Sequence, residues 1–149
     1  MEKKNAIVLT DGLLMTSDAK TAHGLIRGTE RFHIIGLVDG EANAGKDAGV
    51  LLDGKRRDIP VFATMEAAID ALENVDYLII GVATVGGILP KNMLALIYDA
   101  VEKGISVVNG LHEYLNDKPD LVALAASNGA QLIDVRKPKS RADLHFWDG

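Results

Sequence analysis

The sequence predicts an α/β protein with a doubly wound, parallel sheet of the Rossmann-like type, in three α/β/α layers. The 149-residue chain contains six short apolar runs rich in β-branched residues, and segments with helical spacing separate most of them. Such alternation is typical of right-handed β–α–β crossovers, which produce parallel sheets. The strand order of dinucleotide-binding folds is favoured, with a flavodoxin-like order as the alternative.

The six predicted strands are apolar at consecutive positions, as expected for parallel strands that are covered on both faces. The run at residues 77–82 is the strongest, so we expect this strand to lie at the centre of the sheet. The other strands are predicted at residues 6–9, 33–38, 61–62, 105–108 and 131–135.

Four helices are predicted between these strands from their capping residues and from apolar side chains at helical spacing. Proline suits the first turn of a helix, and glycine commonly follows the last. The predicted starts, in chain order, are Ser17 or Asp18, Thr64, Pro90 and Asp117 with Pro119, and the predicted stops include Gly28, Gly104 and Gly129.

Composition argues against several classes of function. The chain has no cysteine, which rules out disulfides, thiolate nucleophiles and cysteine-based metal sites, and is consistent with a cytoplasmic protein. With 16 Lys and Arg against 21 Asp and Glu, the net charge of −5 argues against nucleic acid as a partner. The best apolar run, residues 78–83, is far shorter than the roughly 20 residues of a membrane span. The four histidines are not spaced for a metal site, so we expect no metal.

The loops after the first and fourth strands are the expected ligand site, because doubly wound sheets bind ligands beyond the carboxyl strand ends where the strand order reverses. The first of these loops, residues 10–17, has one glycine in place of the G-x-G-x-x-G turn that holds a dinucleotide pyrophosphate. Its amides and hydroxyls can still hold an anion, although Ser17 can equally be a helix cap. Asp39 ends the second strand, where it can accept hydrogen bonds from a ribose or form a solvated turn with Gly40.

Further candidates lie on the same predicted edge of the sheet. His112, in the loop after the fifth strand, is the candidate general acid or base, with a backbone-bonded loop residue as the alternative. Gly81 and Gly86 allow a backbone to approach a ligand closely, or else serve a flexible turn. Lys46 can contact a phosphate, although residues 45–49 lack the spacing of a Walker A loop. The residues predicted to contact a cofactor are Asp11, Gly12, Lys20, Thr21, Asp39, Lys46, Gly81, Ala83, Gly86, Asn109 and Gly110.

Several segments, taken together, resemble the DUF1611 family. Residues 17–27 carry its K-T-A-x-G-L-x-R pattern, and Val38-Asp39 with residues 44–49 matches the segment after its second strand. Residues 110–115 and 134–138 match its later segments. The similarity is collinear over nearly the whole chain.

The resemblance implies a Rossmann-like domain at residues 1–136, followed in family members by a larger P-loop NTPase-like domain. Residues 137–149 would then be a linker toward that second domain, which this sequence lacks, so we expect the chain alone to be inactive. Some family members are D-glutamate N-acetyltransferases, which move an acetyl group from acetyl-CoA to the amine of a D-amino acid. The implied cofactor is acetyl-CoA or another nucleotide, and the implied partners are the P-loop domain and further copies of the chain in a homo-oligomer.

Two other functions stay open. The domain can be a non-catalytic module for domain or oligomer assembly, which would leave it silent toward nucleotides in calorimetry. It can also be an NAD-linked protein of the epimerase or dehydratase type, against which the missing glycine fingerprint counts.

Overall fold

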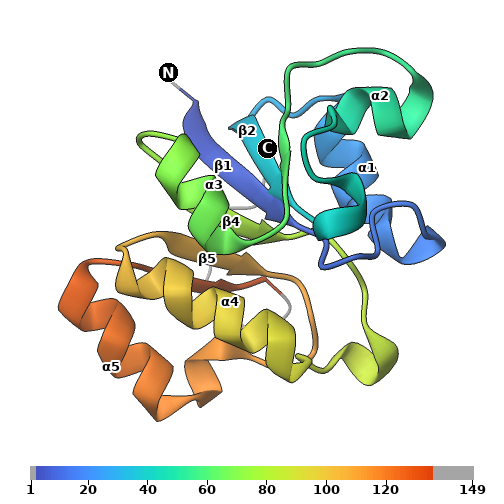
Figure 1. The fold of residues 1–149 in the computed structure, drawn as a ribbon. Helices are drawn as coiled ribbons and strands as arrows, with labels where there is room; N and C mark the ends of the chain where they lie inside the picture. Colours follow the sequence, from blue (N-terminus) through green and yellow to red (C-terminus); the bar gives the residue numbers. More distant parts are fainter. Residues whose placement is uncertain (1–2, 136–149) are drawn as a thin grey trace.

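The sheet has six strands, all parallel, in the order β3-β2-β1-β4-β5-β6 (Figure 1). The computed structural model describes residues 3–135 of the chain. This order confirms the dinucleotide-binding arrangement and not the flavodoxin-like alternative, and it puts β1 and β4 at the centre. The strands are β1 (Lys4–Leu9), β2 (Phe32–Val38), β3 (Val61–Phe62), β4 (Tyr77–Ile80), β5 (Ser106–Asn109) and β6 (Leu132–Asp134).

Helices cover the sheet on both faces, so the predicted three-layer α/β/α architecture is confirmed (Figure 1). One face carries α1 (Lys20–Arg27) and α2 (Ala48–Asp53), which contact each other. The other carries α3 (Met65–Ala71), α4 (Lys91–Glu102) and α5 (Pro119–Asn128), with α4 in contact with both neighbours. Four short 3-10 helices lie in the loops, at Ser17–Ala19, Glu41–Asn43, Val85–Gly87 and Leu115–Asp117.

The four predicted helices are all present, with one difference in capping and one helix that was not predicted. Thr64 caps α3 as predicted, since its Oγ1 accepts a hydrogen bond from Ala67 N at 3.1 Å. Ahead of α1, however, the capping side chain is Thr16 and not Ser17 or Asp18, because a 3-10 turn precedes the helix. Helix α2 was missed, because it is only six residues long and has Gly49 inside it.

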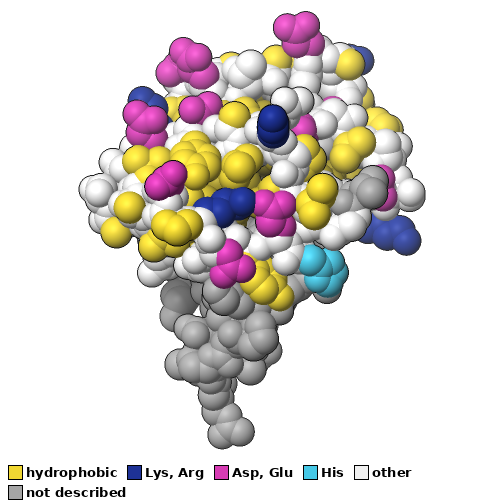
Figure 2. All heavy atoms as spheres, turned by 90° about the horizontal axis from the view of Figure 1, so that it is seen from below, with side chains coloured by type: hydrophobic (Ala, Val, Ile, Leu, Met, Phe, Trp, Pro, Cys, Tyr) yellow, Lys and Arg dark blue, Asp and Glu magenta, His cyan; other side chains and the backbone are white. Residues whose placement is uncertain are grey.

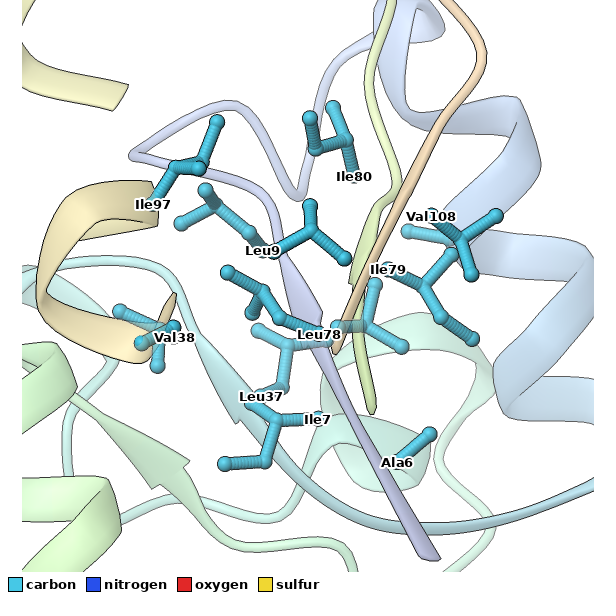
Figure 3. Packing of buried hydrophobic residues seen from close by; sticks show 14 of the residues in the cluster. Ala6, Ile7, Leu9, Leu37, Val38, Leu78, Ile79, Ile80, Ile97 and Val108 are labelled. Atoms are coloured by element: carbon cyan, nitrogen blue, oxygen red, sulfur yellow. The ribbon is translucent and has the colours of Figure 1, made fainter. Parts of the chain in front are cut away.

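The core is built from the central strands and the helices packed on them. Ile7, Leu9 and Leu78 are fully buried, and Ile97 of α4 lies toward Leu9 (Figure 3). On the face that carries α1, Ile79 of β4 lies beside Val108 of β5, its partner in the parallel ladder (Figure 3). This continuous apolar filling explains why the strands have no alternating polar pattern in the sequence.

Charged side chains are scattered over the face seen from below in Figure 1, where acidic and basic groups lie among hydrophobic ones (Figure 2). No helix within residues 3–135 has the length and hydropathy needed to cross a bilayer. The predicted linker at residues 137–149 lies outside the described residues.

Candidate ligand-binding cleft

A cleft of about 770 Å³ lies at the carboxyl ends of β4, β5 and β6, within the roughly 300–1,000 Å³ range of small-molecule sites. The loop after β4 forms one wall and the loop after β5 forms the other, with buried strand residues between them. The cleft is lined by Thr21, Ile79, Ile80, Val82, Ala83, Thr84, Gly86, Gly87, Val108, Gly110, Leu111, His112 and Val135.

His112 is the only ionisable side chain among the described residues that line the cleft. Its exposed ring packs directly on the backbone of Gly87, where an added Cβ would lie 2.5 Å from His112 Cδ2. Gly87 also has a φ of 70°, so both the close approach and the backbone conformation require glycine there. Gly86, with a φ of 68°, has nothing within 4 Å of the Cβ position, so its backbone is open on that side.

Glu113 holds the two walls of the cleft together. Its backbone N donates to Gly87 O at 2.9 Å, and its Oε1 accepts a hydrogen bond from Leu89 N at 2.7 Å. Its Oε2 pairs with Lys118 Nζ at 2.5 Å. The bond to Lys118, followed by the bond to Leu89 N, lowers the pKa of the Glu113 carboxyl below its ordinary value. The carboxylate is therefore ionised at neutral pH and bridges both loops.

Asp134, at the end of β6, supports the loop after β5 from beneath. This fully buried carboxylate accepts hydrogen bonds from Asn109 Nδ2 at 2.8 Å, Leu115 N at 2.9 Å, Asn116 N at 2.9 Å and Asn116 Nδ2 at 2.8 Å. Burial raises the pKa of Asp134, but these bonds lower it by more, so the net shift is downward. The side chain thus fixes the segment that carries His112.

Asp39 has the corresponding role for the loop after β1. Its Oδ1 accepts from Thr10 Oγ1 at 2.7 Å, Gly12 N at 3.0 Å and Leu14 N at 3.1 Å. Its Oδ2 accepts from Asn43 Nδ2 at 2.7 Å. Both oxygens of this buried carboxylate therefore bond within the chain, in the place where dinucleotide folds offer an acid to a ribose. Because Asp39 is buried, the solvated-turn alternative does not apply, and the ribose contact stays a prediction.

Asp11 follows β1 and Gly81 follows β4, so both residues lie at the switch point between these two strands. Burial, and then the neighbouring Asp39 carboxylate, raise the pKa of Asp11, which also has a positive φ of 47°. A Cβ on Gly81 would lie 2.5 Å from Val8 Cγ1 and 2.9 Å from Ala22 Cβ. Ala22 N, in the first turn of α1, already donates to Gly81 O at 3.0 Å. The tight packing at Gly81 thus joins α1 directly to the end of β4.

The predicted site residues separate into two groups. Thr21, Ala83, Gly86 and Gly110 line the cleft together with His112, the candidate acid or base. The cleft lining does not include Asp11, Gly12, Lys20, Asp39, Lys46, Gly81 or Asn109.

The sequence patterns predict no role for Glu113 or for Asp134. The available signal for Asp134 is an acidic residue that ends an apolar run, as Asp39 does after β2. Within residues 3–135, no group of three or more His, Asp or Glu side chains is arranged to hold a metal ion.

Comparison with known proteins agrees with this fold. Residues 41–138 match the DUF1611_N family, a domain of unknown function described as Rossmann-like. A crystal structure of a DUF1611 family protein from Anabaena variabilis superposes with a TM-score of 0.79 at 31% identity, over 93% of this chain and 38% of that one. The NADPH complex of 1-deoxy-D-xylulose 5-phosphate reductoisomerase from Zymomonas mobilis has a TM-score of 0.54 at 17% identity, over 90% of this chain and 39% of that one, which is a similarity of fold.

Two curated relatives are D-glutamate N-acetyltransferases. The protein from Pseudoalteromonas sp is 37% identical over 62 residues, which are 42% of this chain and 19% of the relative. The protein from Tritonibacter scottomollicae is 43% identical over 61 residues, which are 41% of this chain and 18% of the relative. The aligned part thus spans less than a fifth of each relative's length.

Proposed function

Because this chain belongs to the DUF1611_N family of Rossmann-like domains, we propose that it is the nucleotide-binding domain of an N-acetyltransferase that acts on D-glutamate or a similar D-amino acid. Acetyl-CoA is the proposed acyl donor. The observation that supports the proposal most is the sequence similarity to two D-glutamate N-acetyltransferases. The activity is proposed for the longer protein, since the similarity spans a small part of those enzymes.

The proposed reaction needs a neutral amine, a group that takes its proton, and donors that stabilise the oxyanion. The amine nitrogen attacks the thioester carbonyl, the C–S bond breaks, and the CoA thiolate leaves and takes up a proton. In this proposal His112 receives the proton of the amine, which is supported by its place as the one ionisable side chain among the described residues of the cleft. NAD-linked chemistry is less well supported, because the loop after β1 has one glycine in place of the G-x-G-x-x-G turn.

The carboxyl edge is the proposed contact surface for the P-loop domain of the longer protein and for the assembly of its copies. Met15, in the loop after β1, and Ile88, in the loop after β4, are 59% and 57% exposed. Burial of these apolar side chains against a partner would remove them from water, which is favourable. The absence of cysteine fits the reducing cytoplasm in which we expect the enzyme to work.

The test is an assay of the full-length protein encoded by the gene, with acetyl-CoA and D-glutamate. We expect release of free CoA thiol, together with an acetylated amino acid detected by mass spectrometry. Replacement of the proposed base, H112N, is expected to lower kcat by about 10²-fold or more. H33N is the matched control, because His33 is also exposed but lies in the amino-terminal part of β2. Well-folded protein that releases no thiol would refute the proposal.

A further inference from the structure

The cleft differs from the rest of the chain in carrying almost no charge. Asp, Glu, Lys and Arg make up 25% of the chain, yet none of the described residues that line the cleft is one of these. The lining consists of aliphatic side chains, glycines, two threonines and His112. The described lining therefore offers a ligand no Asp, Glu, Lys or Arg side chain.

Such a lining selects against the charged parts of both proposed substrates. D-Glutamate carries two carboxylates, and CoA carries several phosphate charges. An ionised group that leaves water is strongly disfavoured unless a counter-charge and hydrogen bonds replace its hydration. Among the described residues, the Lys and Arg side chains lie outside the lining, for example Lys20, which is exposed and directly precedes the cleft residue Thr21.

The uncharged arm of the donor has the chemistry that the cleft provides. The pantetheine chain of CoA combines apolar segments with two amide groups. Ile79 and Val108 give a buried apolar floor, and Thr21, which also lines the cleft, carries a hydroxyl group. The backbone of Gly86 is open to a ligand, because nothing lies within 4 Å of its Cβ position.

We propose that this cleft binds the pantetheine arm of the acyl donor, with the phosphates outside near Lys20 and the D-amino acid carboxylates held by other parts of the protein. This inference rests on the proposed function, because it takes acetyl-CoA as the donor. It narrows the role of the domain to donor binding, and leaves recognition of the amino acid to cationic groups outside the cleft.

Titration of the 15N-labelled 149-residue chain with four separate probes tests the proposal. The probes are pantetheine, CoA, adenosine 3′,5′-bisphosphate and D-glutamate, followed by NMR at the amides of Gly86, Gly110 and His112. Pantetheine and CoA are expected to shift these resonances saturably, with a Kd for pantetheine on the order of 0.1–1 mM. The bisphosphate and D-glutamate are expected to leave them in place. Silence toward pantetheine, or saturable shifts of these amides by D-glutamate, would overturn the proposal.

A pair of glycine variants separates ligand contact from backbone strain. Gly86 and Gly129 have φ values of 68° and 72°, and neither has an atom within 4 Å of its Cβ position. Only Gly86 lines the cleft, since Gly129 ends α5. We expect G86A to weaken pantetheine binding about tenfold and G129A to change it less than about twofold. Equal effects of the two variants on binding would contradict the assignment.

A second variant keeps the test decisive if G86A folds poorly. Ala83 lines the cleft and is exposed, so A83L narrows the cleft without straining the backbone. It is expected to abolish the pantetheine-induced shift at Gly110. The thiol-release assay distinguishes failure of this inference from failure of the proposed function. Thiol release by the full-length protein without pantetheine shifts here would refute only the cleft assignment, and pantetheine shifts without thiol release would refute only the proposed reaction.

Discussion

Removal of the Asp134 carboxylate tests how strongly one buried side chain holds the loop that carries His112. In D134A, Leu115 N and Asn116 N lose the acceptors that lie 2.9 Å away in the wild type. Asn109 Nδ2 keeps Glu113 O, and Asn116 Nδ2 keeps Leu132 O. Because an unpaired buried N–H costs about 1–3 kcal/mol and Asn116 is partly hydrated, we expect a loss of about 2–4 kcal/mol. That is a large part of the roughly 5–15 kcal/mol by which domains are stable.

Urea unfolding at pH 7, followed by far-UV circular dichroism, measures this loss. D134N keeps one acceptor oxygen and is expected to lie between D134A and the wild type. D99A, which removes an exposed carboxylate on α4, is the control and should stay within about 0.5 kcal/mol of the wild type. A D134A protein as stable as the D99A control would refute the role assigned to Asp134.

G81A should lower the free energy of unfolding by about 1–3 kcal/mol in urea, because its Cβ would lie 2.5 Å from Val8 Cγ1. G24A, with nothing within 4 Å of its Cβ position in α1, should be neutral or stabilising, so equal losses would contradict the packing argument. D47A should speed amide hydrogen exchange at Arg57 and Ile59, whose N–H groups donate to Asp47 at 3.0 and 2.7 Å, while the exchange of Leu115 stays unchanged. The folded-state pKa values of Asp134 and Glu113 are lowered, so these carboxylates stabilise the fold at neutral pH. This stabilisation is lost as the pH falls below about 4, through the lowered pKa values. The wild type should therefore lose more stability in acid than D134A does.

The fold could be predicted from the sequence because its information is local and repeated. Consecutive apolar residues such as those at 77–80 indicate a strand that is covered on both faces, and caps such as Thr64 mark where helices begin. Helix α2 was not predicted, because a glycine inside a short segment is typical of a loop. In the structure Gly49 serves close packing, since a Cβ there would lie 2.3 Å from Lys55 O.

The site was only partly predictable, because the roles of its residues depend on contacts between distant segments. The sequence places His112 on the correct edge of the sheet, since the loop after a parallel strand lies there. It does not reveal that Asp39 is occupied by donors from residues 10–14 and 43, or that Gly81 packs against α1. The cleft lies at the carboxyl ends of β4, β5 and β6.

A crystal structure of the full-length protein with bound CoA tests the central claim most directly. We predict density for the pantetheine arm between residues 83–87 and 110–112, over Ile79 and Val108, with the phosphates outside. Density for the whole donor beside residues 10–16, or elsewhere with this cleft holding only solvent, would contradict the account.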